Sequence, residues 1–288
     1  YDPAPDPAQM LDWEDDVLPM IEVTSSARDA ALIAVAWDSG ARSGEIRSLN
    51  IGDIADNRHG LQITVQGKVG QRSIILIPSV PYLKRWLDVH PGSKNPNAPL
   101  WSKLNKPESF SYQMFRNILE GAADKAGVHK PVTFTNFRKS SASYLASQNV
   151  NQAHLEDHHG WKRGSDIASR YISTFSHETN REIARAHGAD VEPVETEPIA
   201  PITCPRCDRE TPRDEDFCVW CHQAVSHDAL EDLKFKERNL RDSVLKLVQD
   251  KPELLEEVDR LQTLMTVMED NPALHEDAEA FLEALQAG

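Results

Sequence analysis

The sequence lacks any long hydrophobic run, any recognisable secretory signal and any cysteine outside one short segment. None of its apolar stretches approaches the roughly 20 residues that a membrane-spanning helix requires, and no signal-peptide pattern is visible at the N-terminus. These absences argue against a membrane-spanning or secreted protein and predict a cytoplasmic one. With 288 residues, the chain is long enough to form more than one domain.

Apolar periodicity predicts a mostly helical structure with one β-hairpin. Residues 27–37 form a largely apolar helical stretch, which Gly40 can terminate as a C-terminal cap. Apolar residues recur at helical spacing over 112–126. Leu61, Ile63 and Val65 alternate with polar residues, and Ile74, Leu76 and Pro78 continue this spacing after a glycine-bearing turn, which is typical of two paired antiparallel strands.

Two capping residues predict where later helices begin. A helix is expected to run from Arg138 to Ala146, and Asn151 can cap the helix that follows. Ser165 is suited to cap a short helix that carries Tyr171. Together these elements predict a mainly α fold with a small antiparallel β-sheet.

Four short segments carry residues suited to phosphate chemistry. Arg42 lies in the segment that follows the first helix, Lys68 at the hairpin tip, Arg138 at the start of a helix and Tyr171 after a Gly160-Trp161 pair. A planar guanidinium donates two parallel hydrogen bonds to a phosphate and keeps its proton. Two such groups can stabilise the charge that builds up during phosphodiester transfer, without a metal ion.

The remaining residue types complete that chemistry. A tyrosine phenol, with an ordinary pKa near ~10, becomes a nucleophile where cationic neighbours favour the phenolate. A lysine on a hairpin that enters the minor groove can protonate the departing 5′ oxygen as a general acid. Lys68 also suits a simple polar turn, since glycines flank it.

In this order, the four segments resemble the active site of the tyrosine recombinase, or phage integrase, family. The resemblance implies that Tyr171 attacks the scissile phosphate of double-stranded DNA, forms a 3′-phosphotyrosyl link and releases a 5′-hydroxyl. Arg42 and Arg138 match the two family arginines, Lys68 the hairpin lysine, and Trp161 a position that holds histidine or tryptophan. The resemblance also implies self-association on DNA.

The chain departs from the family pattern around its second arginine. Thr135 stands where the family usually has histidine, and Lys139 replaces a frequent histidine just after the arginine. Threonine can donate one hydrogen bond but cannot act as a base near neutral pH. A site-specific recombinase is therefore the main prediction. A type IB-like topoisomerase and an inert DNA-binding or assembly protein stay open as alternatives.

The net charge is unusual for a protein that binds DNA. Lys and Arg total 31 against 46 Asp and Glu, for a formal charge of −15, whereas phosphate contacts normally come with a basic patch. Acidic residues can lie away from the DNA, or the protein can be adapted to a salt-rich cytoplasm; the composition favours a haloarchaeal-type origin. Because the family usually has an N-terminal DNA-clasping domain, a chain beginning at Tyr1 is expected to be a fragment that binds DNA weakly.

All four cysteines occur as two Cys-x-x-Cys pairs. Cys204, Cys207, Cys218 and Cys221 have the spacing of two knuckles around one tetrahedral zinc ion. Four thiolates leave no open coordination position, so the predicted zinc is structural, and His222 is not needed as a ligand.

The sequence divides into four parts. Residues 1–188 form the predicted catalytic domain, 189–203 an acidic, proline-containing linker, and 204–224 a zinc ribbon. In 225–288, apolar residues from Leu240 to Met268 alternate spacings of three and four, interrupted by Pro252. This pattern predicts a helical hairpin or a short coiled coil, and a small helical core is an equally good interpretation.

Overall fold

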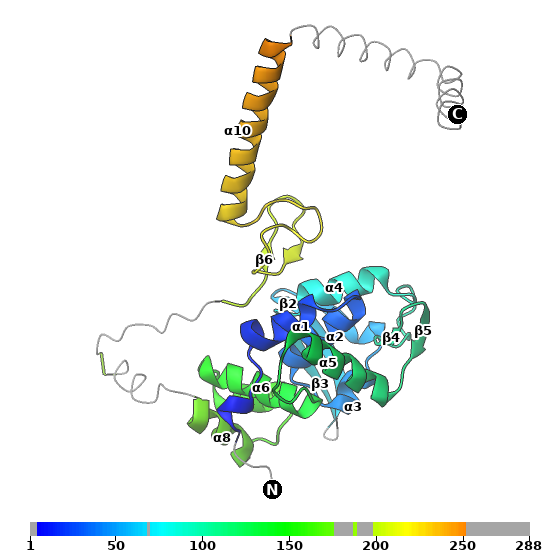
Figure 1. The fold of residues 1–288 in the computed structure, drawn as a ribbon. Helices are drawn as coiled ribbons and strands as arrows, with labels where there is room; N and C mark the ends of the chain where they lie inside the picture. The colour runs from blue at the N-terminus through cyan, green and yellow to red at the C-terminus, as the bar shows by residue number, and fades with distance from the viewer. Residues whose placement is uncertain (1–4, 68–69, 176–186, 189–197, 252–288) are drawn as a thin grey trace. The chain divides into compact units, whose positions relative to one another are not determined.

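The chain divides into two units, residues 1–223 and residues 224–288, and the described part of the second unit ends in helix α10, His227–Asp250 (Figure 1). The computed structural model describes residues 5–67, 70–175, 187–188 and 198–251. The first unit is mostly helical with small antiparallel sheets, as predicted. In chain order its elements are η1 (Pro7–Gln9), η2 (Trp13–Val17), α1 (Leu18–Glu22), α2 (Ala27–Ser39), α3 (Ser43–Arg47), η3 (Ile51–Asp53), β1 (Ile54–Asn57), β2 (Gly60–Gly67), β3 (Gly70–Leu76), α4 (Val80–Val89), β4 (Ser102–Lys103), β5 (Lys106–Ser109), α5 (Tyr112–Ala126), α6 (Phe134–Ser147), α7 (Gln152–His159), α8 (Asp166–Phe175), β6 (Ile202–Thr203) and β7 (Glu210–Thr211).

Helix α2 runs through the main hydrophobic core and ends beside the candidate site. Ser26 caps its N-terminus by accepting a hydrogen bond from the Asp29 amide. The helix is buried from Ala31 to Trp37 and packs against α1, α4 and α6. Gly40 ends it in the left-handed conformation with φ 51°, as predicted. The chain therefore turns sharply just before Arg42.

The predicted hairpin is present and belongs to a three-stranded antiparallel sheet in the order β1-β2-β3. In β2 and β3, Leu61 pairs with Leu76 and Ile63 with Ile74, and these four side chains are buried. Val65 pairs with Arg72, so an arginine occupies the next position on the same apolar face. The sheet thus directs one arginine toward the protein interior.

Helices α6, α7 and α8 form a smaller core beside the main one, and α6 and α8 lie side by side (Figure 1). Thr133 caps α6, so this helix begins at Phe134. The sequence had suggested a start at Arg138. Asn151 caps α7 as predicted, through the His154 amide. Helix α8 begins at Asp166, directly after Ser165, and carries Tyr171 as predicted, but the buried Ser165 hydroxyl makes no capping hydrogen bond in the described structure.

The second unit contains helix α10 (His227–Asp250). Ser226 caps it, and its apolar residues Leu240, Val244 and Leu247 are at least half exposed. The continuation of this apolar pattern, from residue 254 to 268, lies outside the described residues, as do Lys68 and residues 189–197 of the linker. The predictions for those segments stay predictions. None of the described helices is long and apolar enough to cross a membrane.

Candidate active site and metal centre

Arg138 is held by the C-terminal ends of two helices. Its Nη1 donates a hydrogen bond of 2.8 Å to the carbonyl of Gly40, the cap of α2. Its Nη2 donates to the carbonyl of His159, the last residue of α7. The C-terminal carbonyls of a helix have no partner within the helix and carry partial negative charge. They therefore orient the guanidinium without neutralising it as a carboxylate would.

Arg42 precedes α3 and is oriented by a buried carboxylate. The Arg42 amide donates to Glu45 Oε2 at 2.8 Å, and Arg42 Nη1 donates to Oε1 at 3.0 Å. A longer contact of 3.4 Å joins Nη2 to the carbonyl of Gly160. The side chain of Arg42 is 46 % exposed, whereas that of Glu45 is 4 % exposed. Arg42 can therefore meet a ligand from solvent while its base is fixed.

A third arginine, Arg72 of β3, completes the cluster. Its Nη1 and Nη2 donate to the two carboxylate oxygens of Glu45 at 2.6 and 2.9 Å, and its Nε donates to the carbonyl of His158 at 3.2 Å. Consecutive carbonyls at the end of α7, those of residues 158, 159 and 160, thus accept from Arg72, Arg138 and Arg42 in turn. The end of α7 organises all three arginines.

Arg72 is not part of the residue pattern that the sequence offers for the site. A usable signal was present, because Arg72 falls in alternation with the apolar Ile74 and Leu76. A charged residue at an inward-facing strand position requires a partner when it is buried. That partner, Glu45, lies 27 positions earlier in the chain and could not be identified from strand periodicity.

The cluster carries more positive charge than the nearby Glu45 can balance. Burial, together with the charges of Arg42 and Arg72, lowers the pKa of Arg138 to about 9, against the attraction of Glu45 and Tyr171. Burial would raise the pKa of Glu45, but the hydrogen bonds from Arg72 and the Arg42 amide outweigh it and bring the pKa to about 2. An anion placed between Arg42 and Arg138 would relieve the repulsion among the arginines.

Three aromatic rings are stacked next to these arginines. The rings of His159 and Trp161 have centroids 4.7 Å apart at 16°, and those of Trp161 and Tyr171 are 5.4 Å apart at 15°. The Arg138 guanidinium lies over the Trp161 ring at 5.4 Å. The Tyr171 side chain is buried at 5 % exposure against Ala142 and Ala146 of α6 and its neighbours. Trp161 therefore links the predicted nucleophile to the second arginine.

The other predicted residues differ in how close they lie to this centre. Thr135 is exposed in the first turn of α6, three residues before Arg138 and hence on the same helical face. His158 is oriented inward, and burial lowers its pKa to about 4, so the ring is neutral at pH 7. Lys68 lies outside the described residues, but Gly67 and Gly70 beside it line a pocket of about 180 Å³ together with Arg42 and Trp161.

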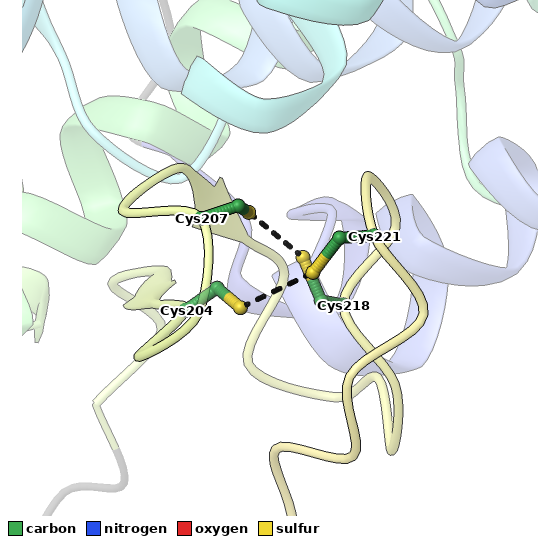
Figure 2. A group of neighbouring side chains, drawn as sticks. All are labelled: Cys204, Cys207, Cys218 and Cys221. Atoms are coloured by element: carbon green, nitrogen blue, oxygen red, sulfur yellow. Dashed lines mark hydrogen bonds between the residues drawn. The ribbon is translucent and has the colours of Figure 1, made fainter.

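The four cysteines converge as predicted (Figure 2). All four Sγ atoms lie within 4.8 Å of one another, with 3.6 Å between Cys204 and Cys221 and 3.7 Å between Cys207 and Cys218. Sulfurs bound to one tetrahedral zinc at ~2.3 Å would be separated by roughly 3.8 Å. The cluster therefore has the dimensions of a tetrathiolate metal site.

The two knuckles have the same backbone construction. In the first, the Cys204 amide donates to the Arg209 carbonyl at 3.0 Å, and Asp208 is left-handed with φ 54°. In the second, the Cys218 amide donates to the Gln223 carbonyl at 2.7 Å, and His222 is left-handed with φ 57°. His222 thus has a backbone role in the knuckle.

Comparison with known proteins identifies the family. The model of the phage integrase family matches residues 13–178, which is more than half of the chain. The chain belongs to the phage integrase family. The match contains all of the predicted catalytic residues, from Arg42 to Tyr171, and ends before the cysteines.

Individual relatives agree with this assignment. A tyrosine recombinase, slr0733, of Synechocystis sp. is 29 % identical over 119 residues, which are 40 % of this chain and 37 % of that protein. The crystal structure of XerA recombinase superposes with a TM-score of 0.50 at 22 % identity, covering 66 % of this chain and 68 % of the other. This second likeness shows the shared fold. The chain spans well under half the length of the curated relative that it matches.

Proposed function

We propose that this chain is the catalytic part of a site-specific DNA recombinase that cuts and rejoins DNA through a 3′-phosphotyrosyl intermediate. The P–O bond to Tyr171 forms as the bond to the 5′ oxygen breaks. The phenol loses its proton to water, and Lys68 supplies a proton to the leaving oxygen. Attack by a 5′-hydroxyl of a partner strand reverses the step and releases Tyr171.

The observation that carries this proposal is the convergence of Arg42, Arg138 and Tyr171 on the C-terminal end of α7. Arg138 is fixed by two carbonyls and has excess positive charge around it. Such preorganised charge stabilises the transition state without reorganisation during the reaction. Trp161, stacked on the Tyr171 ring, sets the position of the phenol relative to Arg138.

The partners follow from the reaction. Exchange between two duplexes requires one cutting tyrosine for each strand, so double-stranded DNA and further copies of the chain are the proposed partners. The four thiols are proposed to bind one structural zinc ion, because the chain offers no open coordination position for catalysis there. Cytoplasmic location and a halophilic source stay predictions.

The direct test is covalent trapping on a suicide duplex that is nicked close to the cleavage site. After cleavage the short strand with the free 5′-hydroxyl diffuses away, so the covalent adduct cannot be reversed. The wild-type chain is expected to form a protein–DNA adduct in high salt. Relaxation of plasmids that lack any particular site would instead favour a type IB-like topoisomerase. DNA binding without any adduct would favour the inert binding protein, for which the absence of histidine at Thr135 provides the physical reason.

A further inference from the structure

We propose that Arg72 is a positioning residue of the recombinase, and that it holds the root of the β2–β3 hairpin against Glu45 so that the hairpin tip meets the DNA in the reactive position. This inference rests on the proposed function. It concerns a residue that acts through its neighbours and not one that touches the scissile phosphate.

The hydrogen bonds of Arg72 show that it is not a third phosphate ligand. Its Nη1 and Nη2 both bind the Glu45 carboxylate, and its Nε binds the His158 carbonyl. The Arg72 side chain is 14 % exposed, compared with 46 % for Arg42. A guanidinium whose fork is already paired with a carboxylate in this way has little left to offer to a phosphate.

Glu45 also touches the hairpin on its other strand. A Cβ atom added to Gly67 would lie 2.8 Å from Glu45 Oε1 and 3.4 Å from Arg72 Nη1. The bare backbone at Gly67 is therefore what allows β2 to pass directly over the carboxylate. Arg72 joins β3 to the same group, so both strands are fixed to Glu45 close to the described ends of the hairpin, Gly67 and Gly70.

The clamp also reaches the turn that leads to Trp161. Gly160 is left-handed with φ 60°, and a Cβ there would lie 2.8 Å from Arg72 Nη1. The Arg72 guanidinium is thus packed between Glu45 and the end of α7. One side chain connects the hairpin, Glu45 of α3 and the turn after α7. Lys68 belongs to the hairpin, Arg42 directly precedes α3 and Trp161 follows α7.

Loss of the Arg72 contacts should affect the step in which Lys68 protonates the leaving 5′ oxygen. Loss of the clamp would let the hairpin tip move while Arg42 keeps its own bonds to Glu45. A displacement of about 1 Å at a reacting group can cost about 100-fold in rate. The cleavage rate should therefore fall by about 100-fold in Arg72→Gln, with little change in DNA affinity, and Arg72→Lys should recover part of the loss.

A sulfur substitution separates positioning of the hairpin from a general structural role. When sulfur replaces the leaving 5′ oxygen of the suicide duplex, the P–S bond breaks and a thiolate departs without needing a proton, because thiols are far more acidic than alcohols. Wild type, Arg72→Gln, Lys68→Ala and Arg42→Lys are compared on the oxygen and sulfur duplexes. Arg58→Gln is the matched control, since Arg58 is exposed in the turn between β1 and β2 of the same sheet.

The expected result is that sulfur restores cleavage by Arg72→Gln and Lys68→Ala but not by Arg42→Lys. Rescue of Lys68→Ala without rescue of Arg72→Gln would overturn the positioning role. The second measurement needs no activity: amide hydrogen exchange over 60–67 and 70–76 should accelerate in Arg72→Gln but not in Arg58→Gln. Unchanged amide exchange in Arg72→Gln would overturn the proposed role of Arg72. If exchange accelerates as expected but the wild-type chain cleaves neither duplex, only the proposed function is contradicted.

Discussion

The two candidate sites of this chain differ in how far apart their residues lie in the sequence. The four cysteines occupy residues 204–221, and each knuckle closes on itself through its own backbone hydrogen bonds. Arg42 and Tyr171 are 129 positions apart and meet only because α2, α6, α7 and the hairpin pack together. A local site depends on its ligand, whereas an assembled site depends on the whole fold around it.

Two ion pairs join the ribbon to α4 in the described residues. Lys84 of α4 pairs with Glu210 at 2.8 Å, and Asp88 pairs with Arg209 at 3.3 Å. The Asp88–Arg209 pair is exposed, and exposed ion pairs contribute about 0–1 kcal/mol each. Damage to the ribbon is therefore expected to leave the arginine cluster intact.

Tyr171→Phe is expected to abolish the covalent adduct, because phenylalanine keeps the ring stacked on Trp161 but has no nucleophilic oxygen. Gel electrophoresis of the suicide-substrate reaction measures it. Tyr112→Phe, at an exposed position of α5, is the control and should react normally. An undiminished adduct in the Tyr171 variant would remove Tyr171 from the proposed mechanism.

Arg138→Lys is expected to lower single-turnover cleavage by about 10²–10³-fold, the usual cost of losing one preorganised donor. Lysine keeps the charge but cannot bind two carbonyls and a phosphate with one planar group. Arg42→Lys should behave in the same way, while filter binding stays close to wild type. The exposed Arg116→Lys serves as control, and near-normal cleavage by Arg138→Lys would contradict its role.

Cys218→Ser is expected to lower the metal content from one zinc per chain to well below one, measured by atomic emission. Cleavage should persist, since the two sites are built from separate residues. His222→Asn is the matched control, because asparagine tolerates the left-handed backbone and His222 is not a ligand. Loss of cleavage in proportion to zinc would show that the ribbon supports the catalytic fold.

Glu45 should make the catalytic unit sensitive to acid. Because its folded pKa of about 2 is below the ordinary 4.5, its stabilisation is complete above pH 4.5 and is lost as the pH falls through 2. The contribution is about 3 kcal/mol. Urea unfolding at a series of pH values should show a shallower acid limb for Glu45→Gln. Glu120→Gln, which removes an exposed carboxylate, should follow wild type; equal acid limbs for all three proteins would contradict the buried ion pairs.

Removal of the Thr135 hydroxyl should have the smallest effect on cleavage. Its exposed hydroxyl can donate one hydrogen bond to a phosphate, so Thr135→Ala should slow cleavage only modestly. Thr135→His should accelerate cleavage or shift its pH optimum, since a positioned acid or base contributes typically ~10²–10⁴-fold. A pH–rate profile of the three proteins measures both. If neither wild type nor Thr135→His forms an adduct, the inert DNA-binding interpretation is the better one.

Much of the local structure could be predicted from the sequence. The presence of the hairpin, the Gly40 cap and the Asn151 cap follow from short-range patterns, and the structure contains all three. The second strand spans Gly70–Leu76, earlier than the predicted 74–78. The start of α6 at Phe134 and the absence of a capping hydrogen bond from Ser165 could not be predicted, because each depends on how neighbouring polar residues pack in the folded chain. Capping preferences are worth about 1 kcal/mol, which tertiary packing readily overrides.

By itself, the sequence determined the cysteine cluster and the order of the family residues, because spacing alone specifies a knuckle and a motif. Only the tertiary structure decided that Arg72 belongs to the site and that three arginines share the end of α7. The physical reason is that a buried guanidinium needs acceptors, and its acceptors here come from Glu45 and from a helix end 86 positions away. Those partners become neighbours only when the chain has folded.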